Sequence, residues 1–147
     1  NKENICEEID KTISYLRARL SNKISLEFEH PKDEIIVYLN NQLFSWSLEN
    51  IIKNSIDSIK DSGKVKISII EENEYLKIYI SDNGIGIKQS LKNKIFNPGV
   101  TTKERGWGLG LSLSKRIIEE YHKGEIKLIE SIVGQGTKML IKLKAVK

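Results

Sequence analysis

The chain has 147 residues, of which 39% are apolar and 30% charged, values typical of one globular domain with a real core. It contains no apolar run long enough to cross a bilayer and no signal-peptide pattern, and its lone cysteine, Cys6, excludes an internal disulfide. The net charge of +4 comes from dispersed lysines that do not interleave with the few aromatic residues, so we expect no nucleic-acid partner.

The first half of the chain predicts two helices and two strands. Isoleucine and leucine recur at helical spacing over residues 5–20, which indicates an amphipathic helix. Alternation predicts a strand over 24–29, and a nearly continuous apolar run predicts a second, well-buried strand over 34–39. A long helix is expected over about 43–60, ended by the turn at 61–63.

The second half predicts two hairpins and a further helix. Alternating residues pair 65–69 with 76–80, and 126–128 with 139–143. The other predicted segments are a short helix over 88–95, a loop over 96–107 and a helix over 108–121. Hairpins imply a mixed, largely antiparallel sheet, and about three helices can cover one of its faces. The predicted fold is therefore a two-layer α/β (α+β) sandwich and not a doubly wound sheet.

Five of the ten glycines lie in two short turns, at residues 82–86 and 106–111. Neither turn has the spacing of a P-loop or a Rossmann fingerprint. The second runs into a helix that begins near Gly108, whose free amide N–H groups suit a phosphate. A loop packed by glycines for steric reasons explains this turn equally well.

Three polar residues could serve a ligand beside these turns. Asp82 ends a strand, where its carboxylate can accept a hydrogen bond from an amino group such as that of adenine, or can simply support an Asx-type turn. Asn50 and Asn54 share one helix face, although asparagine is unfavourable inside a helix. An amide oxygen suits Mg²⁺, and the alternative is a solvated polar face.

Together these residues resemble the ATP-binding catalytic domain of sensor histidine kinases, in a group that also contains DNA gyrase, the MutL proteins and the ninety-kilodalton heat-shock chaperone. The resemblance covers nearly the whole chain and implies the Bergerat-type ATP-binding fold. Its boxes occur in the family's order: the N box at 50–55, the first glycine box at 82–86, the F box at 95–99, the second glycine box at 106–111 and the Gly-x-Gly-Thr segment at 134–137.

The resemblance implies a role for each matching residue. Asn54 would hold Mg²⁺ between the phosphates, with Asn50 supporting the phosphate side. Asp82 would bond the adenine amino group, and Thr137 would support that contact. Lys103 would touch the γ-phosphate as a point charge. The catalytic residues would thus be Asn54 and Lys103.

The remaining matches would shape the nucleotide site. Gly84 and Gly86 would let the backbone pass close to the base. The F box contributes Phe96, and Thr101 and Thr102 precede a short lid that we expect to be mobile until ATP arrives. The second glycine box, which would form the lid end and the phosphate-facing helix start, contributes Gly106, Gly108, Leu109, Gly110 and Leu111.

One position favours a kinase over an ATPase. In the gyrase-like enzymes the family pattern has a glutamate as general base four residues before the magnesium asparagine, where this chain has Asn50. Glu49 is rotated by about 100° around the helix and should point elsewhere. The alternatives are a gyrase- or MutL-like ATPase module, a serine kinase of the anti-sigma type, and a non-enzymatic partner-binding domain.

The resemblance also implies partners that this sequence does not contain. Neither His30 nor His122 lies in an acceptor motif, so the phosphoacceptor histidine is expected on a dimerisation domain of the same protein, a homodimer in its full length. The chain is then one domain, 1–147, whose first helix (1–22) leads from that absent domain. A response regulator would receive the phosphoryl group downstream. The domain is expected in the cytoplasm without membrane contact of its own, whether or not its parent is membrane-anchored.

Overall fold

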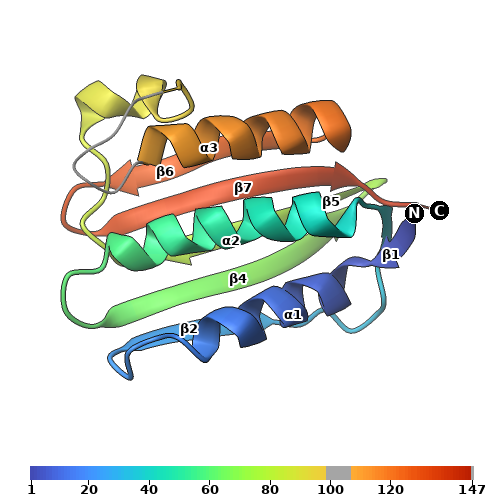
Figure 1. The fold of residues 1–147 in the computed structure, drawn as a ribbon, viewed down its shortest axis with the longest axis horizontal. Helices are drawn as coiled ribbons and strands as arrows, with labels where there is room; N and C mark the ends of the chain where they lie inside the picture. Colours follow the sequence, from blue (N-terminus) through green and yellow to red (C-terminus); the bar gives the residue numbers. More distant parts are fainter. Residues whose placement is uncertain (99–106, 147) are drawn as a thin grey trace.

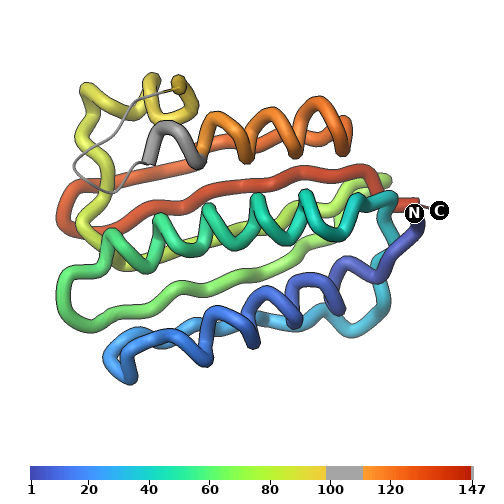
Figure 2. Tube along the Cα trace, viewed as in Figure 1, coloured from blue at the N-terminus to red at the C-terminus, as the bar shows by residue number. Residues whose placement is uncertain are grey.

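The computed structural model describes residues 1–98 and 107–146, and only the backbone of residues 107–110. Its three α-helices lie side by side on one face of a sheet (Figure 1), with α2 in the middle between α1 and α3 (Figure 2). No helix in these ranges is long and apolar enough to cross a membrane. In chain order the elements are β1 (Lys2–Asn4), α1 (Ile5–Arg17), β2 (Ile24–Glu29), β3 (Ile36–Tyr38), α2 (Asn41–Asp57), β4 (Gly63–Glu72), β5 (Tyr75–Asp82), the 3₁₀ helix η1 (Gln89–Lys94), α3 (Trp107–Arg116), its π-helical last turn η2 (Ile117–Tyr121), β6 (Glu125–Ile132) and β7 (Gly136–Lys144).

The main sheet has five strands in the order β2-β4-β5-β7-β6. The first pair, β2 and β4, is parallel, and the other pairs are antiparallel. This is the mixed, largely antiparallel sheet of the predicted sandwich. The central strands β5 and β7 place Asp82 directly opposite Thr137, at the end of the sheet away from the chain termini (Figure 1).

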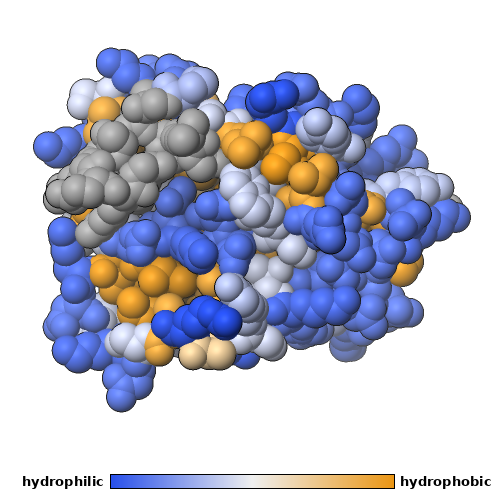
Figure 3. Space-filling view, viewed as in Figure 1, coloured by the Kyte–Doolittle hydropathy of each residue, from blue (hydrophilic) through white to orange (hydrophobic). Residues whose placement is uncertain are grey.

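The core lies between the helices and the sheet, as the periodic apolar residues predict. The side of the protein that carries the helices is mostly hydrophilic, with apolar side chains showing in two separate areas (Figure 3). Alternate residues of the strands face the helices and are buried. The most completely buried side chains are Phe44, Ile5, Ile9, Ile13, Leu48, Ile51, Ile52, Ile67, Leu76, Ile78, Ile80 and Ile95.

Both long helices differ from their predicted bounds at the ends. The first stops at Arg17, three residues before the predicted end, where the Arg17 guanidinium donates to the carbonyl of Leu26. The second begins two residues early because the Asn40 side chain caps it, accepting from the Leu43 N–H at 3.1 Å. It ends at Asp57, and Ser58 follows as its C-cap.

The predicted buried strand over 34–39 is only partly correct. Only Ile36–Tyr38 forms a strand, and it pairs with β1 in a separate two-stranded sheet. Tyr38 is 61% exposed, whereas its neighbours Val37 and Leu39 are buried. The apolar run was therefore an alternating strand with one face on the core, and its partner β1 is too short to show a pattern.

The outer face of the sheet is charged with both signs. Lysines of β4 pair with glutamates of β2: Lys64 with Glu27 at 3.6 Å, and Lys66 with Glu29 at 3.2 Å. The fold also brings lysines over tyrosines that are distant in sequence: Lys138 over Tyr79, and Lys142 over Tyr75.

Candidate nucleotide-binding site

A small cavity gathers predicted site residues from three parts of the chain. It lies under α2 and α3 at the end of the sheet where β5 stops and β7 starts. Its volume is about 20 Å³, close to the space of one water molecule. The residues that line it are Ile51, Asn54, Ser55, Asp82, Ile87, Ile95, Leu111, Thr137 and Met139.

Asp82 supplies the carboxylate of this cavity. One carboxylate oxygen accepts from the Gly84 N–H at 2.9 Å and shares the hydrogen of the Ser58 hydroxyl, at 3.3 Å, with the Ser55 carbonyl at 2.7 Å. Burial raises the pKa of Asp82 above its usual range, and these two hydrogen bonds, with one from the Ser55 hydroxyl, only partly oppose the rise. Asp82 therefore braces its own turn, as the Asx-turn interpretation predicts, and it also lines the cavity, while its contact with adenine stays a prediction.

The loop after Asp82 is clamped on both sides. On one side the Ile85 N–H donates to the carbonyl of Ser58 at 2.9 Å. On the other, the Ile85 carbonyl accepts from the Gly134 N–H at 2.9 Å. A Cβ on Gly84 would lie 2.0 Å from the Ser58 hydroxyl oxygen, and Gly86 has φ +78°. In this structure the two glycines allow close approach to protein backbone, and their predicted closeness to a base stays a prediction.

Gly84→Ala should destabilise the fold by about 3 kcal/mol, because the new methyl group meets the backbone of Ser58 as well as its hydroxyl. Gly134→Ala is the matched control. Its Cβ would meet nothing within 4 Å, so only its positive φ costs energy, about 1 kcal/mol. Urea unfolding of both variants measures the difference. Equal losses in the free energy of unfolding would show that Ser58 moves away from the new methyl group at little cost.

Asn54 is partly buried on α2 and faces the same cavity. Its amide nitrogen is buried without a hydrogen-bond partner in the described structure. Such an orphaned amide is costly unless a ligand engages it. The described residues hold no cluster of three or more His, Cys, Asp or Glu that could cage a metal. An amide oxygen here fits Mg²⁺, which keeps several waters and relies on substrate phosphates rather than on a protein cage.

Serines of α2 and its C-cap are turned inward rather than toward solvent. Ser47 and Ser58 are fully buried, and Ser55 is nearly so. Asn50, one turn before Asn54, donates its amide to the Trp46 carbonyl at 2.8 Å and does not line the cavity. The structure therefore joins Asn54 to the site and leaves the phosphate-side role of Asn50 a prediction.

Glu49 points away from the cavity, as its position on the helix predicts. It lines a groove between α1 and α2 together with Tyr15 and Trp46, and it pairs with Lys53 at 3.8 Å. Among the described residues that line the cavity, Asp82 is the one carboxylate.

Of two neighbouring hydroxyl residues beside Asp82, Thr137 was predicted as a site residue and Ser131 was not. Thr137 was predicted, and it is 7% exposed beside Asp82. Ser131 was missed, yet its hydroxyl lies 2.7 Å from that of Thr137. Ser55 and Ser58 were also missed as supports of Asp82, although they are three residues apart and so lie on one side of the helix end.

The remaining predicted residues fall into two groups. Leu111 lines the cavity, while Phe96 is half-buried with the Lys115 ammonium 5.1 Å from its ring centre. The backbone of Gly108, Leu109 and Gly110 lies in the first turns of α3, where a helix start was predicted. The predictions for Thr101, Thr102, Lys103 and Gly106, and for the mobile lid, fall outside the described residues.

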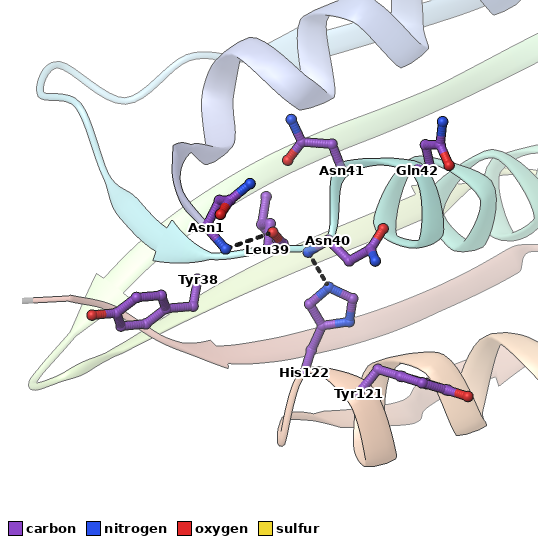
Figure 4. A pocket seen from close by; sticks show the side chains of 8 residues that line it. All are labelled: Asn1, Tyr38, Leu39, Asn40, Asn41, Gln42, Tyr121 and His122. Atoms are coloured by element: carbon purple, nitrogen blue, oxygen red, sulfur yellow. Dashed lines mark hydrogen bonds between the residues drawn. The ribbon is translucent and has the colours of Figure 1, made fainter.

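A larger hollow of about 520 Å³ lies at the opposite end of the molecule and gathers none of the predicted site residues (Figure 4). There His122 accepts from the Asn40 N–H at Nε2 (3.1 Å) and lies 3.0 Å from the Ile117 carbonyl at Nδ1. Since a carbonyl only accepts, Nδ1 carries the hydrogen, and both ring nitrogens are engaged. His30 is held by Asp10 at 2.8 Å, so neither histidine lies at the cavity.

Residues 42–147 match the sequence profile of one family, described as histidine kinase-, DNA gyrase B-, and HSP90-like ATPases. The chain belongs to this family. The resemblance found in the sequence boxes is thereby confirmed, and the cavity lies within the matched part of this ATPase domain.

Solved and curated relatives of this ATPase domain agree with the assignment. The nucleotide-free catalytic domain of histidine kinase ThkA superposes with a TM-score of 0.87, at 28% identity, over 98% of this chain and 94% of that one. Nitrogen regulation protein NtrY of Azorhizobium caulinodans is 38% identical over 71% of this chain, and sporulation kinase E of Bacillus subtilis is 34% identical over 92%. The matches span only 14% and 18% of those two proteins.

Proposed function

We propose that this chain is the ATP-binding catalytic domain of a sensor histidine kinase. It binds ATP with Mg²⁺ and donates the γ-phosphoryl group to a histidine on a separate helical-hairpin domain. The observation that carries the proposal is the cavity that unites Asn54, Asp82 and Thr137 from three elements, with asparagine at position 50.

The base end of the site is formed by Asp82 and its supports. The ionised carboxylate accepts from the exocyclic amino group of adenine, and the Gly84 N–H and the Ser58 hydroxyl hold it in place. Thr137, opposite Asp82 in the sheet, supports this contact. The described cavity has room for about one water, and the apolar Ile95 and Leu111 line it together with these two polar residues.

The phosphate end begins at Asn54 and includes the first turns of α3. Asn54 offers its amide oxygen to Mg²⁺, which neutralises charge on the phosphates when bound. The free N–H groups at the start of α3 favour a phosphate, and Lys103 adds a positive charge. In phosphoryl transfer, placement and charge neutralisation of this kind supply most of the catalysis.

The choice of a kinase over an ATPase rests on two described residues of α2, neither of which is placed to act as a base toward water in the cavity. Asn50 cannot accept a proton from water, and Glu49 faces the groove on the other side of α2. The acceptor histidine and the base that serves it then belong to the dimerisation domain of the same protein, which is a homodimer. A response regulator is the downstream partner, as in the solved complex of ThkA with the response regulator TrrA. The domain works in the cytoplasm.

Labelling with [γ-³²P]ATP and Mg²⁺ tests this proposal, with the chain alone and with the proposed phosphoacceptor domain added. Label should appear only on the acceptor domain, as an acid-labile and alkali-stable phosphohistidine. Rapid phosphate release by the chain alone would favour the ATPase alternative. Acid-stable label on an added protein would favour the serine kinase.

A further inference from the structure

Ser131 forms a hydrogen-bonded junction behind the cavity. Its side chain is 2% exposed, and its hydroxyl accepts from the Ile87 N–H at 2.8 Å. The same oxygen lies 2.7 Å from the Thr137 hydroxyl and 3.3 Å from the Gly136 carbonyl. It therefore connects the loop after Asp82 to the start of β7.

A β-bulge in β6 aims Ser131 at this junction. Leu128 pairs with Met139, but the next pair is Glu130 with Lys138, so Ile129 is an extra residue. Without the extra residue, strict alternation from Leu128 would turn Glu130 toward the helices and Ser131 outward. The bulge reverses that phase, and bulges of this kind often re-aim a side chain beside a functional site. Asp82, Thr137 and Ser131 then form one cross-strand row on the cavity side.

The hydrogen bonds of Ser131 constrain the direction of the Thr137 hydroxyl. A serine hydroxyl has one hydrogen to donate and two positions that accept. If Ser131 donates to Thr137, the hydrogen of Thr137 is free to point into the cavity. If Thr137 donates to Ser131, the hydrogen of Ser131 turns to the Gly136 carbonyl and the lone pairs of Thr137 face the cavity. In both cases the hydrogen bond with Ser131 determines whether the Thr137 hydroxyl offers a ligand its hydrogen or its lone pairs.

We infer that Ser131 is a positioning residue for adenine recognition, acting through the Thr137 hydroxyl. The inference rests on the proposed function, since it needs a nucleotide in this cavity. It predicts a dependence between two residues: removing the Ser131 hydroxyl matters to ATP only while Thr137 keeps its own.

A double-mutant cycle tests the dependence, with ATP affinity and the free energy of unfolding measured for each protein. Ser131→Ala should weaken ATP binding by about fivefold, the effect of losing one ordinary hydrogen bond. In a Thr137→Val background the same change should have less than about a twofold effect, as expected for residues that act as one unit. Ser47→Ala is the matched control, because Ser47 is fully buried but does not line the cavity.

A second measurement compares the affinity for ATP with that for purine riboside triphosphate, which lacks the amino group. A purely structural effect of Ser131 would leave the ratio of these two affinities unchanged. The preference for ATP should shrink in Ser131→Ala and stay unchanged in Ser47→Ala. Ser131→Cys keeps a similar volume with weaker hydrogen bonds, and it should show a smaller effect in the same direction if Ser131→Ala does not fold.

The outcomes separate the inference from the proposed function. If the wild-type chain does not bind ATP, the proposed function fails. If wild type binds and the change at Ser131 leaves both affinity and discrimination unaltered, only the inference fails. An equal loss in both Thr137 backgrounds would also overturn it, because Ser131 would then act independently of Thr137.

Discussion

Asp82→Asn is expected to weaken ATP binding by about a hundredfold, while the free energy of unfolding does not fall. Asparagine keeps the shape of aspartate and one oxygen for the Gly84 N–H. It loses the charge and places an N–H₂ group where the second acceptor oxygen was, so it cannot serve the adenine amino group in the same way. Hydrogen bonds to charged groups contribute about 1.5–3 kcal/mol, and each 1.4 kcal/mol is about tenfold in affinity.

The raised pKa of Asp82 sets the sign of two pH effects. Because the pKa is higher in the folded chain than in the unfolded one, the ionised carboxylate costs stability at pH values above its folded pKa. That cost disappears as pH falls below the unfolded pKa, and it is absent at all pH values in Asp82→Asn. ATP affinity should show the opposite trend, falling as acid protonates the carboxylate, from a pH higher than an ordinary aspartate would require.

Urea unfolding and ATP titration, each at several pH values, measure both effects. Asp61→Asn is the matched control, since Asp61 has a side chain 82% exposed and pairs with Lys23 at the surface. It should change neither ATP affinity nor its pH dependence. ATP affinity of Asp82→Asn within threefold of wild type would remove Asp82 from the base contact.

Asn54→Ala is expected to remove the Mg²⁺-dependent part of ATP binding and to slow phosphoryl transfer by at least about a hundredfold, since it deletes the amide oxygen proposed to hold the ion. Stability should change little, because the buried amide nitrogen of Asn54 has no hydrogen-bond partner to lose among the described residues. ATP affinity measured with Mg²⁺ and with a chelator isolates the effect as the ratio of the two values. That ratio should approach one in the variant.

Lys53→Ala provides the control for this change on the same helix. Lys53 is exposed and pairs with Glu49 on the groove side, away from the cavity. Its ratio of affinities with and without Mg²⁺ should equal that of wild type. If Asn54→Ala keeps the wild-type ratio, the ion is held elsewhere, and Asn54 is an internal polar residue of the α2–α3 interface.

Periodicity predicted the elements where one face of each is buried. The stripe from Ile5 to Leu16 and the alternation in β4, β5 and β7 were sufficient to predict a helix-covered sheet. The same reasoning placed Asp82 at a strand end, whereas Thr137 was predicted to lie near it only from the family resemblance. It failed around β3, where the buried Ile35, Val37 and Leu39 together with the half-buried Ile36 looked like a continuous apolar run.

Features that depend on exceptions to these patterns were not predictable. The bulge at Ile129 shifts β6 by one residue, so alternation from Leu128 gives no sign that Ser131 faces the helix side. The close contact between Gly84 and Ser58 depends on where α2 ends, because Ser58 is its C-cap. Helix ends are predicted from sequence only to within a few residues. The predicted phosphate contacts of Lys103 and its neighbours lie outside the described residues and remain predictions.

Titration of the wild-type chain with ATP and with GTP, in the presence of Mg²⁺, tests the central claim most directly. A cavity in which Asp82 accepts from the amino group of the base should bind ATP saturably. It should bind GTP at least about tenfold more weakly, because the guanine carbonyl at that position offers no hydrogen and leaves the buried carboxylate unpaired. Equal binding of the two nucleotides, or no saturable binding of ATP, would contradict the assignment of this cavity as an adenine site.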